Sequence, residues 1–162
     1  MHFFNENKSL IGGIHRLMRL NKSTGYALQI LLYLTKNRRI VSSMELTENI
    51  AVSQRYLIQI AGKLRSGELV ITTIGMGGGY ALFKEPALIS VYDIIVLMEG
   101  GICIPQNLTT SVNNLSNLYD IFLLLTEYIE TYLRSVTLDK LTDGVYSGAF
   151  WQRSDRIQAS SQ

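Results

Sequence analysis

The stretch SSMELTENIAVSQRYLIQIAGKLRSGELVITTIGMGGGYAL, residues 42–82, contains the pattern that determines the expected fold. Ser43 is predicted to cap a first short helix, because its hydroxyl can accept from backbone N–H groups that lack a helical partner. Leu46 and Ile50 follow at helical spacing on one face. After a brief turn, Ser53 is predicted to cap a second helix. Its apolar stripe consists of Leu57, Ile60, Ala61 and Leu64.

The second helix leaves a polar and basic face outside its apolar stripe. Two short helices in a row, the second with such a face, predict a helix-turn-helix. Gln and Arg suit bidentate reading of adenine and guanine edges, and Lys suits phosphate. The candidate DNA contacts on this helix are Ser53, Gln54, Arg55, Tyr56, Gln59 and Lys63.

A predicted β-hairpin follows the second helix. Gly67 can end that helix, residues 69–73 are mostly β-formers, and residues 80–83 form a second strand-like run after a glycine loop. A helix-turn-helix followed by such a hairpin is a winged helix, whose wing lies along phosphates or in a minor groove. The candidate wing contacts are Gly77, Gly78, Gly79 and Tyr80. A hairpin that touches nothing is the alternative, whereas a phosphate-binding nucleotide loop lacks the following Lys and helix.

The order of these motifs resembles a bacterial regulator family. The matching segments are Tyr26-Ala27-Leu28, Ser53–Leu57 with Gln59, Lys63-Leu64-Arg65, Gly67, Leu69-Val70, Gly77-Gly78-Gly79-Tyr80, Ile89-Ser90-Val91 and Glu99-Gly100-Gly101. Together they are similar to the winged-helix family of IscR, NsrR and CymR, over about residues 18–140. The resemblance implies a dimeric DNA-binding protein.

Two positions depart from that family pattern. Where relatives often carry Arg-Gly-Pro before the paired glycines, this chain has Ile74-Gly75-Met76. The wing therefore lacks an arginine that could enter a minor groove, and its readout should differ. Ile58 stands where some members place a carboxylate, which indicates a changed sequence preference.

Charge is distributed unevenly along the 162 residues. Residues 1–85 hold eleven Lys and Arg and five Asp and Glu, whereas residues 86–162 hold four and eight. A basic first half fits a polyanionic partner, because neutralised phosphates supply most non-specific affinity. A solvated basic surface would give the same count. No apolar run is long enough to span a membrane, and no signal peptide is evident, so a soluble, cytoplasmic protein is expected.

The chain divides into predicted segments around the winged helix. Residues 1–17 are expected to be an N-terminal extension, because the resemblance begins close to Met18. The winged-helix domain covers residues 18–100, including a helix over residues 23–34 and another over residues 91–99 capped by Ser90. A loop over 101–114, helices over 115–143 with Thr137 capping the last one, and a tail over 144–162 complete the chain.

The loop over residues 101–114 bears on the cofactor. Several relatives hold an iron–sulfur cluster with three cysteines in this region, but this chain has one cysteine, Cys103, and its histidines are His2 and His15. A single thiolate cannot supply the ligands that a cluster takes, and the histidines lack ligand partners. No cofactor and no metal are predicted. Cys103 is a loop or packing residue, with a redox-sensing thiol as the alternative.

Residues 115–136 carry the strongest periodicity. Leu115, Leu118, Phe122, Leu125, Ile129, Tyr132 and Val136 alternate spacings of three and four, a heptad seam. A long helix with so much apolar surface should bury one side in a second copy, and the resemblance places the dimerisation helix here. The predicted dimer contacts are Leu118, Phe122, Leu125, Ile129 and Tyr132. A core helix within one chain is the alternative.

The predicted fold is thus mainly α-helical with a small β-hairpin wing, a winged helix-turn-helix plus a long C-terminal dimerisation helix. The predicted function is a sequence-specific transcriptional regulator, a homodimeric repressor on double-stranded operator DNA, responding to a small-molecule or protein effector. The alternative is a winged-helix module that binds a protein and no longer binds DNA. An enzyme is not expected, because no nucleophile–base set or carboxylate pair stands out.

Overall fold

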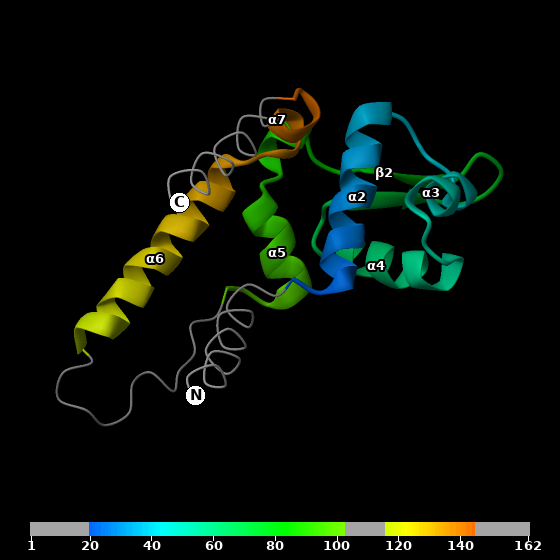
Figure 1. The fold of residues 1–162 in the computed structure, drawn as a ribbon. Helices are drawn as coiled ribbons and strands as arrows, with labels where there is room; N and C mark the ends of the chain where they lie inside the picture. The colour runs from blue at the N-terminus through cyan, green and yellow to red at the C-terminus, as the bar shows by residue number, and fades with distance from the viewer. Residues whose placement is uncertain (1–19, 103–115, 145–162) are drawn as a thin grey trace, which may run out of the picture.

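The computed structural model describes residues 20–102 and 116–144. The predicted extension over residues 1–17, Cys103 with nearly all of the predicted loop, and the tail beyond Gly144 lie outside the described residues. The described chain is mostly helical with one two-stranded antiparallel sheet (Figure 1), which confirms the predicted fold class. No helix in this part of the chain is both long and apolar enough to cross a membrane.

The helix α2, Lys22–Asn37, is the central element of the core. Its buried face includes Ala27, Ile30, Leu31 and Leu34, each at most 1 % exposed. Around it pack the helices α3, Ser43–Ile50, α4, Gln54–Ser66, and α5, Val91–Glu99. These elements share one apolar cluster, which holds the helix-turn-helix against the rest of the chain.

The hairpin consists of β1, Val70–Thr73, and β2, Gly79–Leu82, with Val70 opposite Leu82 and Thr73 opposite Gly79. An isolated bridge adds Val41 to the other edge of β2, because Val41 and Tyr80 exchange two backbone hydrogen bonds of 2.8 Å. The chain that leaves α2 is thereby fixed to the wing. Leu69 donates its N–H to Leu64 O at 2.9 Å and ties β1 to the end of α4.

After the wing, the 3-10 helix η1, Pro86–Leu88, leads into α5. Ser90 and Asp93 form a reciprocal capping box at the start of α5, and Gly100 ends it at φ 86°, as the sequence predicts. The helix α6, Ser116–Ser135, begins far from the core in Figure 1 and runs diagonally toward it, and α7, Leu138–Thr142, follows against the core. The Ser90–Thr137 bridge and the buried Leu138 anchor α7 there.

Two details of the predicted caps need correction. The N-cap of α3 is Ser42, not Ser43: Ser42 has an extended backbone and accepts from Glu45 N, whereas Ser43 already lies in the helix. Both serines fit a cap by residue type, so the sequence alone does not separate them. Thr137 occupies the N-cap position of α7, but its hydroxyl donates to the Asp139 carboxylate instead of accepting from a backbone N–H.

Candidate nucleic-acid interface

The helix-turn-helix consists of α3, a three-residue turn and α4. Ser53 caps α4 as predicted, accepting from Tyr56 N, and the apolar stripe of α4 is buried, with Leu57 and Leu64 fully covered. The turn requires a left-handed residue at its start, a conformation that Ala51 adopts at φ 53° and ψ 43°. The sequence does not use glycine there, although glycine adopts this conformation most readily.

The outward face of α4 carries most of the predicted contacts. The side chains on this face are exposed because they lie opposite the buried stripe: Ser53, Gln54, Arg55, Gln59 and Lys63. Ile58 lies among them and is 55 % exposed. The structure therefore brings the predicted polar readers together on one side of a single helix, where they can enter a groove about 12 Å wide.

Tyr56 is placed differently from its neighbours. It is half-buried, and its ring meets the ring of Tyr26 edge-on at a centroid distance of 5.7 Å. This contact fixes the start of α4 against α2, so Tyr56 serves to orient the helix. Lys63, on the same helix, contributes to lowering the pKa of Glu99 at the end of α5.

Two of the predicted wing contacts do not lie on the surface. Tyr80 is only 8 % exposed and belongs to the core, and Gly79 is buried beside Val41. Gly77 is exposed and Gly78 half-buried. The predicted wing contacts therefore separate into a tip that can reach DNA and the start of β2, which packs. The repeated glycines gave no signal of this division.

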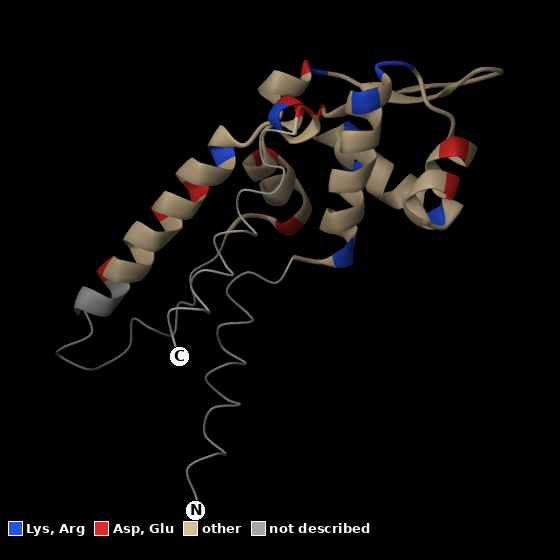
Figure 2. Cartoon of the chain, turned by 45° about the horizontal axis from the view of Figure 1, so that its top comes forward, with Lys and Arg blue, Asp and Glu red and all other residues tan. Residues whose placement is uncertain are grey.

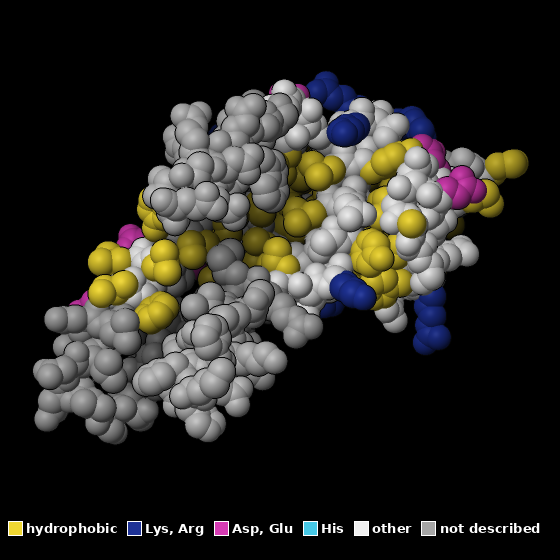
Figure 3. Space-filling model, viewed as in Figure 1, with side chains coloured by type: hydrophobic (Ala, Val, Ile, Leu, Met, Phe, Trp, Pro, Cys, Tyr) yellow, Lys and Arg dark blue, Asp and Glu magenta, His cyan; other side chains and the backbone are white. Residues whose placement is uncertain are grey.

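The wing tip instead exposes two apolar side chains, Ile74 at 95 % and Met76 at 106 %. Figure 3 shows apolar atoms at the far end of the hairpin, and Figure 2 shows no charged residue along it. The sequence carries no charge between Glu68 and Lys84. The departure at Ile74-Gly75-Met76 is visible in the sequence, and the wing expected to approach the DNA backbone, Gly75 to Tyr80, includes Met76 but not Ile74.

A polar network that the sequence did not predict positions the first helix of the motif. Glu45 on α3 accepts from Arg39 at 2.5 and 3.0 Å and from the Tyr33 hydroxyl at 2.9 Å. The hydrogen bonds from Arg39 and Tyr33 lower the pKa of the Glu45 carboxyl. Because Arg39 is engaged in this way, it holds α3 to the end of α2 and is less available to a phosphate.

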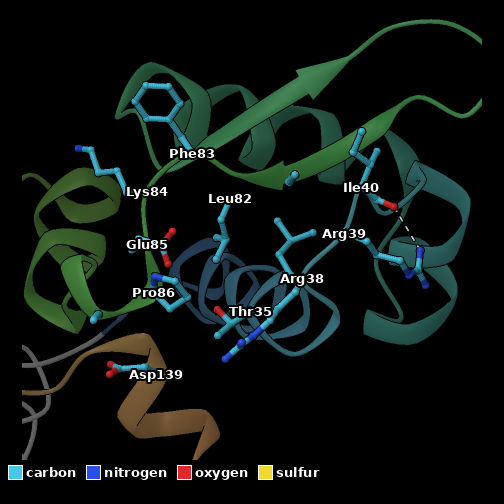
Figure 4. A pocket seen from close by; sticks show the side chains of 13 residues that line it. Thr35, Arg38, Arg39, Ile40, Leu82, Phe83, Lys84, Glu85, Pro86 and Asp139 are labelled. Carbon is cyan, nitrogen blue, oxygen red and sulfur yellow. Dashed lines mark hydrogen bonds between the residues drawn. The ribbon is translucent and has the colours of Figure 1, made fainter.

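A half-open groove of about 650 Å³ lies at the base of the wing. Figure 4 shows around it Thr35 from α2 and Arg38 directly after that helix, the segment Leu82 to Pro86 that ends β2 and follows it, and Asp139 from α7. The Arg38 side chain forms no hydrogen bond or ion pair with any residue in 20–102 or 116–144. With cations and carboxylates on its walls, the groove can hold a small polar molecule that carries both charges.

The donor chemistry of the chain does not fit an iron–sulfur cluster. Cys103 is its single cysteine, and one thiolate cannot replace the ligands that a cluster normally takes. Among the described residues, no group of three or more His, Cys, Asp or Glu is placed to hold a metal ion. The donor set of this chain is therefore too small for such a cluster.

Comparison with known proteins agrees with this arrangement. A protein of Neisseria meningitidis, NMA1593, named as an HTH-type transcriptional regulator, is 31 % identical over 138 residues, covering 81 % of this chain and 92 % of its own. The match to protein aau3 of Rhizobium meliloti, at 30 % identity, covers 55 % of this chain and only 58 % of that protein.

The fold also has close solved counterparts. The structure of CymR, the global cysteine regulator of Bacillus subtilis, superposes with a TM-score of 0.69 at 26 % identity, covering 78 % of this chain and 97 % of that one. Residues 20–144 match the Rrf2 family, described as iron-dependent transcriptional regulators. The chain therefore belongs to the Rrf2 family of bacterial winged-helix proteins and is a DNA-binding transcription regulator, not an enzyme.

Proposed function

We propose that the chain is a cytoplasmic, homodimeric repressor that binds a pseudo-palindromic operator with one α4 helix in each of two successive major grooves. Such grooves lie about 34 Å apart on one side of the duplex, so the operator should repeat with the protein's twofold symmetry. The observation that carries the proposal is the outward face of α4. It is a capped helix with a fully buried stripe on one side and exposed Gln54, Arg55 and Gln59 on the other.

The residues on this face have distinct roles in the proposal. Arg55 and the two glutamines read base edges, because their side chains can form paired hydrogen bonds with guanine or adenine. Lys63, further along α4, neutralises a phosphate. The exposed tip of the wing, residues 74–78, reaches the duplex beside the recognition helix, whereas the Tyr80 side chain stays in the core and takes no part.

The dimer is supported by the surface of α6. Ile121, Leu124 and Tyr128 are 58, 64 and 72 % exposed, and Leu125 and Tyr132 about half exposed, whereas Phe122 and Ile129 are half-buried. Figure 3 shows these apolar side chains gathered over the described part of the helix. The side chain of Leu118 lies outside the described part. The exposed apolar side chains form a row along α6 that a second copy of the same helix could cover. This exposed row consists of Ile121, Leu124, Leu125, Tyr128 and Tyr132.

An effector completes the proposal. The groove at the wing base touches α2, the chain after β2 and α7 together, so a small molecule bound there would contact both the wing and the segment that follows α6. Repression fits a dimer that covers its operator and is released by such a molecule. A protein effector or oxidation of Cys103 is the alternative, and an Arg38→Ala variant separates these routes because only a groove-bound molecule should lose its effect.

Binding to DNA tests the function directly. The wild-type protein selects its operator from a pool of random duplexes, and affinity is then measured on the operator and on a scrambled duplex at several salt concentrations. Arg55→Ala should weaken operator binding by about 10- to 100-fold and random binding much less, because one good bidentate contact is worth about 1–3 kcal/mol. Lys63→Ala should weaken both and lower the salt slope by about one.

A matched control removes a positive charge elsewhere. Lys22 is exposed at the start of α2 and is not part of α4, so Lys22→Ala should leave operator preference unchanged. Failure of the wild-type protein to select any sequence, or equal operator affinity in Arg55→Ala, would contradict this assignment of the recognition helix.

A further inference from the structure

The wing tip combines full exposure with an apolar character that phosphate contacts do not explain. Ile74 and Met76 are 95 and 106 % exposed, and the chain between Glu68 and Lys84 contains no charged residue. A wing without Lys or Arg cannot neutralise phosphates with its side chains. Burying one such apolar side chain is worth about 1.5–3 kcal/mol, so the tip is suited to a partner that covers it.

The backbone of the tip is specified closely. Gly78 donates its N–H to Gly75 O at 2.9 Å, and Gly75 and Gly77 take φ values of 103° and 83° that other residues rarely adopt. A Cβ on Gly78 would lie 2.3 Å from Thr73 O. The turn therefore presents Ile74 and Met76 from a defined, narrow stem with almost no side chains beside them.

The stem also fixes the tip relative to the recognition helix. β1 is joined to α4 through the Leu69–Leu64 backbone hydrogen bond, and Val41 bridges to Tyr80, one residue from the tip-proximal pair of the hairpin. In Figure 1 the free end of the hairpin projects beyond α3, at the same end of the molecule as the start of α4. When α4 lies in a major groove, a narrow uncharged tip held beside it faces the adjacent minor groove.

We propose that the wing tip inserts Met76, with Ile74 beside it, into the minor groove as an apolar wedge that partly unstacks a flexible pyrimidine–purine step and bends the operator. Minor-groove proteins use apolar side chains between base steps in this way, and such steps unstack most easily. This inference rests on the proposed function and adds a second reading element, one that senses deformability and does not depend on salt.

The test uses the operator selected by the wild-type protein. The probe duplex carries fluorophores at its ends to report bending and a 2-aminopurine at the step under the wing to report unstacking. We expect the wild-type protein to bend the duplex and to raise the 2-aminopurine signal. Met76→Ala should lose about tenfold in affinity and the I74A/M76A variant more, with both optical signals reduced.

The salt dependence and a control sharpen the test. Because no charge is removed, the slope of log Kd against log salt should be the same in Met76→Ala and wild type, in contrast to Lys63→Ala. Leu88→Ala is the matched control, since Leu88 is 71 % exposed on η1 and not on the hairpin. Its affinity and bending should equal those of the wild-type protein. Thermal unfolding of each variant verifies folding.

The outcomes separate the wedge from the function on which it rests. If the wild type selects an operator but I74A/M76A bends and unstacks it as the wild type does, the wedge is wrong and the tip serves another partner, such as a protein. A changed salt slope in Met76→Ala would also overturn it. If the wild type selects no operator, the proposed function is wrong, and the wedge proposal, which depends on it, is wrong as well.

Discussion

The Glu99 carboxylate caps the helix α2 by accepting the backbone N–H of Asn21 at 2.7 Å, across 78 positions of sequence. It also accepts from the Asn21 side chain at 2.5 Å and from the Thr24 hydroxyl. Asn21 occupies the N-cap position of α2 but forms no side-chain cap bond of its own. Glu99 therefore supplies both the missing acceptor and a negative charge at a positive helix end. The end of α5 is thereby fixed to the start of the central helix.

Removing this charge should destabilise the protein. Glu99→Gln retains one acceptor oxygen but loses the carboxylate, so we expect a loss of about 1–2 kcal/mol in the free energy of unfolding. Denaturant unfolding monitored by circular dichroism measures it. Asp143→Asn, an exposed carboxylate after α7, is the control and should change little.

The same interaction predicts a pH dependence. Burial acts to raise the pKa of Glu99, but the hydrogen bonds from Thr24 and Asn21 outweigh it and leave the pKa below its ordinary value. A lowered folded-state pKa means that the stabilisation is complete above the ordinary glutamate pKa and disappears as the pH falls through the folded value. Stability measured between neutral and acid pH should fall less in Glu99→Gln than in wild type. Parallel curves would contradict this assignment.

A single change in the turn of the helix-turn-helix should stabilise the protein. Ala51 holds a left-handed conformation at φ 53° and ψ 43°, which costs a non-glycine residue about 1–2 kcal/mol. Glycine removes that cost but adds freedom to the unfolded chain. We therefore expect Ala51→Gly to gain up to about 1 kcal/mol in unfolding free energy, measured by chemical denaturation, without loss of operator affinity. A loss of stability would show that the Ala51 methyl group contributes packing that outweighs the strain.

The local patterns of the chain predicted most of the fold. The stripe from Leu57 to Leu64, the caps at Ser53 and Ser90 and the glycine-tipped hairpin depend on neighbours in the sequence, and the structure confirms them. Contacts between distant segments were not predictable in this way. The Glu99–Asn21 cap and the burial of Tyr80 beside Val41 depend on tertiary packing that periodicity does not encode.

The candidate interface shows the same division. Helical periodicity placed Arg55 and Gln59 outside the buried stripe, so their exposure was predictable. Tyr56 and Tyr80 are aromatic residues with a polar tip, a class that occurs both in cores and at interfaces. Only the positions of Tyr26 and Val41 in space show that both tyrosines pack inward. Helical periodicity therefore predicts which face of α4 is exposed, whereas the placement of each tyrosine follows from tertiary contacts.

Replacing Gly79 and Gly62 by alanine should change the free energy of unfolding in opposite directions. A Cβ on Gly79 would lie 2.1 Å from Val41 O, so Gly79→Ala must open the bridge between Val41 and Tyr80. We expect a loss of about 1–3 kcal/mol in unfolding free energy. Gly62, inside α4, has no atom within 4 Å of an added Cβ. Gly62→Ala should gain about 0.5–1 kcal/mol, because glycine is a poor residue for a helix interior. Equal effects of the two substitutions on the free energy of unfolding would contradict the close approach of Gly79 to Val41.

Charge placed on the exposed row of α6 should separate the proposed dimer. Leu124 and Tyr128 lie one helical turn apart and are 64 and 72 % exposed. In a twofold interface each substitution is present in both copies, so its effect on association is doubled. A dimer buried through this row should therefore lose at least about 100-fold in association with Leu124→Glu or Tyr128→Glu. Sedimentation equilibrium measures the change.

Glu127→Gln, on the neighbouring exposed position, should leave the mass unchanged. A wild-type monomer, or a Tyr128→Glu protein that stays dimeric, would assign the row to another partner. Since operator symmetry requires two copies, the monomeric variants should bind a half-site and the full operator with equal affinity.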